Sequence, residues 1–451
     1  MRQRLGFLSI LMVLIFLVGC QQSLQNRVSS KKGTITKKII YTASLYPSYN
    51  ANYVPPVGLK PFELSQDYPK ELVLENYPWQ SIDFTKNPQL YMHTVLYYCL
   101  EGNTDVDFRG QENRIRKWYH APWLHDDEKY AGTDYIGNGR EYIHGMTREF
   151  ATPKYKLHDL QDVELENWAV GMYNSPGGYT LGQVWPGAKQ SPDPGKSHFP
   201  EGTVSFKLLF TDADTKKLPF LNNTLEWKAN IYLCNPNAEC TNKKRIDRTV
   251  RLLQIDIAVK DHRALKTGWV YGTFMYDGSA KGKTVWERMV PVGLSWGNDS
   301  GVVKDLNRDG AFINRELTES FINPALIGSK ENYYAAFLKY HGLGGRLNGP
   351  IDNPVSSCIS CHGNAAVNDR GATLPLGDFK SSTTRQNYSP ESFRQFFKDI
   401  APGANGISYK GENYVTTDYS LQISTGIRNY YANKKSLSGR SEMFFPQTGQ
   451  N

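Results

Sequence analysis

The chain has 451 residues, of which 39% are hydrophobic and 21% are charged, and this length is sufficient for one large elaborated core or for several. Its net charge of +8 comes mainly from seven lysines and arginines before residue 40, in a stretch without any acidic residue. Because the rest of the chain is close to neutral, it lacks the basic surface of a nucleic-acid-binding protein, and we expect no nucleic-acid partner.

The first twenty residues have the pattern of an export signal. Arg2 and Arg4 precede an uncharged apolar run, residues 5–18, which is typical of a secretory signal peptide. No later segment has the roughly 18 consecutive apolar residues that a second membrane span needs. We therefore expect contact with the membrane only through an anchor at the N-terminus.

The signal ends in LVGC, which resembles the lipobox of bacterial lipoproteins. This resemblance identifies residues 1–20 as a lipoprotein signal segment and implies cleavage before Cys20 and acylation of that cysteine. Gln21, in place of Asp, favours the outer membrane under the sorting rule of enteric bacteria. Residues 21–40 are rich in Ser, Gln and Lys and are predicted to be a tether. The predicted location is the periplasmic side of the cell envelope.

Residues 41–280 are expected to form an aromatic-rich, irregular part followed by a β-sheet. Apolar and polar residues alternate in 202–210 and in 251–259, and 268–276 is a third strand candidate. The three segments are predicted to share one antiparallel sheet. We also expect a strand at 179–185.

Three cysteines lie outside the lipobox and outside the motif near residue 360. Cys234 and Cys240 are close enough across NPNAE to form a disulfide in an exported protein. Cys99 is then predicted to be a buried free thiol.

Residues 281–340 are expected to be an insertion that carries a calcium loop. The segment DLNRDGAFINRE has oxygen-bearing residues at the spacing of such a loop, with Gly310 at the sharp turn. A polar turn that happens to match is the alternative. The candidate Ca²⁺ ligands are Asp305, Asn307, Asp309, Ala311 and Glu316.

The segment CISCH contains the strongest motif of the chain. Cys358 and Cys361 are spaced to form thioethers to the two vinyl groups of one haem c, and His362 follows directly as the iron ligand. The alternatives are half of a zinc site and a structural disulfide. Zinc needs four ligands, and the chain has no second CxxC pair.

Residues 341–451 are predicted to be a helical, haem-bearing part. Residues 389–403 begin with a Ser cap and Pro, and 417–431 is a second helix candidate. Met443, the only methionine after the motif, is a candidate sixth ligand of the iron. The predicted fold class is α+β, with an antiparallel β-sheet core, an irregular aromatic-rich N-terminal part and a helical C-terminal part.

The segments FPEGTVSFK and QIDIAVKDHRALKTGWVYGTF, followed late by CISCH, resemble the c-prime-beta cytochromes and their lysine-crosslinked relatives, the P-four-sixty cytochromes. The resemblance covers about a quarter of the chain and implies a mostly antiparallel sheet and a haem with one open face. By position it places Lys207 at the crosslinking lysine and Asp256 at a distal carboxylate. The chain departs from the hydroxylamine-oxidising members where they carry a distal arginine, since Gly182 and Gln183 stand there.

These observations predict a monohaem envelope lipoprotein that transfers electrons to and from periplasmic redox partners. The first alternative is an oxidoreductase, or a binder of NO-like or hydroxylamine-like molecules, that uses the open haem face with Lys207 and Asp256 as candidate catalytic residues. The second is a structural envelope lipoprotein in which haem only stabilises the fold. The sequence does not decide whether the protein is an enzyme.

Overall fold

The computed structural model describes residues 56, 58–60, 62–124, 140–149, 151–187, 190–232, 245–308, 312–327, 341–374 and 389–443. All of them belong to one compact unit, Ser44–Asn451. Within these residues no helix is both long enough and apolar enough to cross a membrane.

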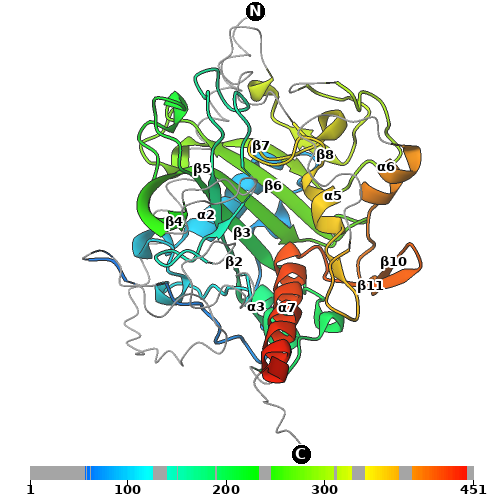
Figure 1. The fold of residues 1–451 in the computed structure, drawn as a ribbon. Helices are drawn as coiled ribbons and strands as arrows, with labels where there is room; N and C mark the ends of the chain where they lie inside the picture. The colour runs from blue at the N-terminus through cyan, green and yellow to red at the C-terminus, as the bar shows by residue number, and fades with distance from the viewer. Residues whose placement is uncertain are drawn as a thin grey trace, which may run out of the picture. The chain divides into compact units, whose positions relative to one another are not determined.

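An eight-stranded antiparallel sheet forms the centre of this unit (Figure 1). Its order is β1-β2-β3-β5-β6-β7-β8, and β4 pairs with one half of the long β5. The three predicted strands are confirmed as the adjacent strands β3, β5 and β6. The strands are β1 (Thr147–Arg148), β2 (Asn167–Tyr173), β3 (Val204–Thr211), β4 (Glu226–Tyr232), β5 (Arg245–Lys260), β6 (Trp269–Tyr276), β7 (Met289–Ser295) and β8 (Ser320–Ile322).

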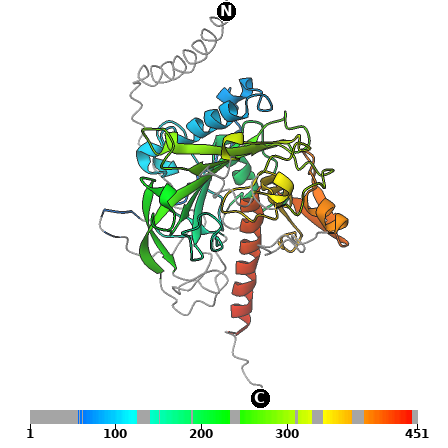
Figure 2. The same cartoon turned by 90° about the horizontal axis from the view of Figure 1, so that it is seen from above.

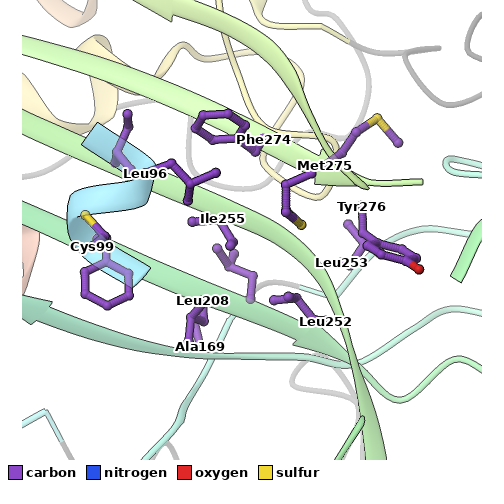
Figure 3. Close-up of a cluster of buried hydrophobic side chains, with 14 of the residues drawn as sticks. Leu96, Cys99, Ala169, Leu208, Leu252, Leu253, Ile255, Phe274, Met275 and Tyr276 are labelled. Atoms are coloured by element: carbon purple, nitrogen blue, oxygen red, sulfur yellow. The ribbon is translucent and has the colours of Figure 1, made fainter. Parts of the chain in front are cut away.

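One face of the sheet packs on the helix α2 (Pro88–Leu100). Because side chains alternate along a strand, Leu208 and Ile255 point to this face while Lys207 and Asp256 point to the other. Figure 3 shows Leu96 and Cys99 of α2 beside Ile255 and Leu208. Cys99 is fully buried with a free thiol, as the sequence predicts.

The other helices are α3 (Ser175–Val184), α5 (Cys358–Gly363), α6 (Pro390–Phe396) and α7 (Leu421–Met443). A second sheet has the order β10-β11-β9, with β9 (Ala366–Val367), β10 (Gly406–Tyr409) and β11 (Glu412–Thr416). The 3₁₀ turns are Pro78–Ser81, Thr104–Val106, Gly110–Glu112, Pro194–Lys196, Pro219–Leu221, Trp286–Arg288, Pro324–Leu326 and Leu343–Gly345. Figure 2 shows α7 in red as one straight helix.

Several predicted elements need correction. The expected strand 179–185 lies largely in α3, because the Asn174 side chain accepts a hydrogen bond from Gly177 N and Pro176 stands in the first turn. The segment 281–340 stays a predicted insertion, and its residues contribute β7 and β8 to the main sheet. The C-terminal part is not simply helical, since it contains the sheet β9–β11.

Both predicted C-terminal helices exist with different ends. The helix expected over 389–403 stops at Phe396, after the Ser389 cap that the sequence indicates. The helix expected over 417–431 begins only at Leu421 and continues to Met443. Its late start follows from the backbone of Asp418 and Tyr419, which have φ values of 45° and 65° and cannot be part of an α-helix.

Candidate functional site

The CISCH segment folds as the short helix α5 because serines cap its beginning. Ser357 accepts a hydrogen bond from Ser360 N, and the Ser360 hydroxyl accepts one from Ser357 N in return. Cys358, Cys361 and His362 therefore stand at positions i, i+3 and i+4, on one side of the helix. All three are partly exposed, and both thiols are free.

His362 is held in one orientation. Its Nδ1 lies 2.9 Å from the carbonyl oxygen of Tyr419, and its ring centroid lies 4.7 Å from that of Tyr271. A carbonyl only accepts hydrogen bonds, so Nδ1 carries the proton and Nε2 keeps its lone pair. Burial lowers the pKa of His362 to about 4, which leaves the imidazole neutral at neutral pH.

A polar row crosses the face of the main sheet that points away from α2. Four residues from adjacent strands stand in register: Gly171 opposite Lys207, Lys207 opposite Asp256, and Asp256 opposite Thr273. The Thr273 hydroxyl donates to Asp256 at 2.8 Å. Lys207 and Asp256, which the resemblance selects, are thus direct neighbours on the polar face.

Carboxylates surround the ammonium group of Lys207. Its Nζ lies 3.8 Å from Glu149 Oε1 and 3.9 Å from Asp256 Oδ2. Burial alone would lower the pKa of Lys207, but these carboxylates outweigh burial and raise it above its usual range. Burial and the nearby Asp352 carboxylate raise the pKa of Asp256 to about 7.

The polar row and α5 belong to one site. Burial raises the pKa of the Cys358 thiol well above its usual range, and the negative charges of Asp256 and Asp352 raise it further. A hydrogen bond with the Thr273 side chain lowers the pKa of this thiol. Lys207 also interacts electrostatically with Cys358 and with His362. The structure therefore brings Lys207, Asp256 and the CISCH segment together.

The site contains four further residues that the sequence-based prediction lacks: Glu149, Asp352, Tyr271 and Tyr419. Strand alternation could have found Tyr271, because it shares a sheet face with Thr273 two residues further along β6. Nothing in the sequence distinguishes Glu149, Asp352 or Tyr419. They reach the site from loops that only the tertiary fold brings together.

The residues present fit a haem better than a zinc ion. A zinc site needs ligand atoms that converge on one point. Among the described residues, only Glu201, Asp261 and His262 converge in this way, and the CISCH residues do not. Two free thiols beside an imidazole whose Nε2 keeps its lone pair match the demands of a porphyrin, whose vinyl groups and iron lie far apart. No disulfide joins Cys358 to Cys361.

The role of Met443 as a sixth ligand stays a prediction. This residue ends α7, which extends for about 33 Å from Leu421 at ~1.5 Å per residue. Leu421 follows Tyr419, the partner of His362, by two residues, and Figures 1 and 2 both show the far end of α7 away from α5. The Met443 side chain itself is not among those that the structure describes.

The calcium loop stays a prediction. Asp309 and Ala311 lie outside the described residues. Of the other candidate ligands, Glu316 pairs with Lys304 Nζ at 3.0 Å, so an ion would have to displace this lysine. The lipidation site Cys20 and the predicted disulfide of Cys234 and Cys240 also lie outside the described residues.

No family model, no curated protein and no solved structure matches this chain. The functional argument therefore depends on the site itself.

Proposed function

We propose that this protein binds one haem c through thioether bonds at Cys358 and Cys361, with His362 Nε2 as the axial iron ligand, and transfers electrons. The observation that carries the proposal is the geometry of α5, where two free thiols and an oriented, neutral imidazole share one side of a capped helix. Bound haem would supply a one-electron iron couple.

The chain's own residues support this role. The Tyr419 carbonyl fixes the tautomer and the plane of His362, and the Tyr271 ring packs beside it. Burial keeps the imidazole neutral and thus able to bind metal. The resemblance to the c-prime-beta cytochromes belongs to the same proposal, and the antiparallel sheet beside a late CISCH segment is consistent with it.

A second candidate function is the binding or conversion of a small nitrogen or oxygen species at an open iron face. The cluster of Lys207, Glu149, Asp256 and Asp352 beside Cys358 favours it, because buried charges are costly and tend to gather at functional sites.

The ferrous absorption spectrum with and without CO or NO separates these functions. A low-spin spectrum that is indifferent to both gases supports the electron carrier. A high-spin spectrum that changes with either gas supports the second candidate. A haem that cannot be reduced and reoxidised contradicts both and favours a structural lipoprotein.

For the second candidate, we expect Lys207→Met and Asp256→Asn each to change NO affinity by about tenfold. Each removes a charged group beside the bound molecule, and one hydrogen bond to a charged group is typically worth ~1.5 kcal/mol or more. Asp212→Asn is the matched control, because Asp212 is also a partly buried carboxylate paired with a cation, Arg248, at 3.0 Å. Equal effects of all three substitutions would contradict a role for the Lys207 cluster.

A further inference from the structure

We infer that Tyr271 and Asp418 are positioning residues that set how strongly the Tyr419 carbonyl binds His362, and that they thereby tune the reduction potential of the iron. This inference rests on the proposed function, since it assumes His362 as the axial ligand. It concerns residues to which neither the motif nor the resemblance assigns a role.

One carbonyl oxygen serves two donors. The Tyr419 oxygen accepts from His362 Nδ1 at 2.9 Å and from the Tyr271 hydroxyl at 3.2 Å. Both bonds are shielded from solvent, because Tyr271 and Tyr419 are 5% and 3% exposed. Two donors that share one acceptor weaken each other, so the Tyr271 hydroxyl limits the strength of the histidine hydrogen bond.

The backbone that presents this carbonyl is held in a conformation that side-chain-bearing residues rarely adopt. Asp418 and Tyr419 are consecutive residues with φ values of 45° and 65°. Left-handed conformations of this kind persist only where surrounding contacts impose them, and they are concentrated at functional sites.

Asp418 supplies most of these contacts. Its carboxylate accepts from Lys260 Nζ at 2.7 and 2.9 Å, from Trp269 Nε1 at 2.9 Å and from the backbone nitrogen of Phe199 at 2.9 Å. On the other side, the Tyr419 hydroxyl bonds both the nitrogen and the oxygen of Ile400, at 2.8 and 3.0 Å. Asp418 therefore bonds the turn to the main sheet, and Tyr419 bonds it to the segment after α6.

A stronger hydrogen bond from Nδ1 makes an axial imidazole a better electron donor, which stabilises ferric over ferrous iron and lowers the reduction potential. Loss of the Tyr271 hydroxyl should strengthen the histidine bond. Loss of the Asp418 anchor should let the carbonyl move away and weaken it. The two changes should therefore shift the potential in opposite directions.

The test is potentiometric titration of the haem-loaded protein in four variants. We expect Tyr271→Phe to lower the potential and Asp418→Ala to raise it. Asp418→Asn should restore most of the wild-type value, because Asn keeps the shape, accepts hydrogen bonds and tolerates positive φ. Tyr276→Phe is the matched control. It removes a hydroxyl from the same strand that also donates to a backbone carbonyl, Asn222 O at 3.0 Å, and it should leave the potential unchanged.

The inference is overturned if Tyr271→Phe shifts the potential no more than Tyr276→Phe does, or if both Tyr271→Phe and Asp418→Ala shift it in the same direction. Failure of the underlying haem proposal is a different result. In that case the wild-type protein carries no covalent haem and gives no titration.

Discussion

His341 is a fully buried histidine at the beginning of the segment that leads to α5. Neither of its ring nitrogens has a hydrogen-bond partner in the part of the chain that the structure describes. Burial lowers its pKa from 6.5 to about 4. The folded protein therefore holds this imidazole neutral, whereas the unfolded chain binds a proton near pH 6.5.

This difference predicts acid sensitivity. A lowered pKa in the folded state contributes stability that is complete above pH 6.5 and is lost as the pH falls toward 4, by about 3 kcal/mol over that interval. We expect His341→Leu to flatten the dependence of the urea midpoint on pH between 6.5 and 4. A variant with the slope of the wild type would show that His341 is not the group that titrates.

At the scale of elements, α2 and the main sheet share one buried apolar cluster. Leu96 is fully buried between α2 and the sheet (Figure 3), whereas Leu90 of the same helix is 52% exposed. The two leucines therefore separate the effect of burial from that of helix propensity.

We expect Leu96→Ala to lower the free energy of unfolding by about 3 kcal/mol, through lost burial and the cavity that remains. Leu90→Ala should change it by less than about 0.5 kcal/mol. Urea denaturation followed by circular dichroism measures both. Similar losses in the two variants would contradict the packing of α2 on the sheet.

The sequence indicates the central strands well, because Ile255 and Asp256, or Leu208 and Lys207, alternate between an apolar core and a polar face. Short elements are harder to predict from the sequence. The strand expected at 179–185 is helical, and the decisive signals were the cap at Asn174 and the proline at 176, outside the segment considered.

In the site, too, the sequence predicts some residues and misses others. The local motif predicts Cys358, Cys361 and His362 because all its residues are adjacent in sequence. Glu149 and Asp352 come from positions about 200 residues apart, which only the fold brings together. The orientation of the Tyr419 carbonyl depends on the positive φ values of Asp418 and Tyr419. The sequence does not predict this conformation, because neither residue is a glycine.

At the scale of the whole molecule, the positive charge is concentrated before residue 40, and the rest of the chain is nearly neutral. We propose that Cys20 carries the lipid that anchors the protein. Cys20→Ala should abolish the incorporation of a radiolabelled fatty acid, which the wild-type protein should carry. A wild-type protein without this label would contradict anchoring through this cysteine.

Mass spectrometry of the matured protein, produced in a host with the haem c maturation machinery, tests the central claim most directly. We predict one haem added to the peptide that contains residues 358–362, and loss of this addition when Cys358 and Cys361 are both replaced by Ala. Cys99→Ala, which removes a buried thiol elsewhere, should leave the haem in place. A wild-type peptide without added haem mass would contradict the account.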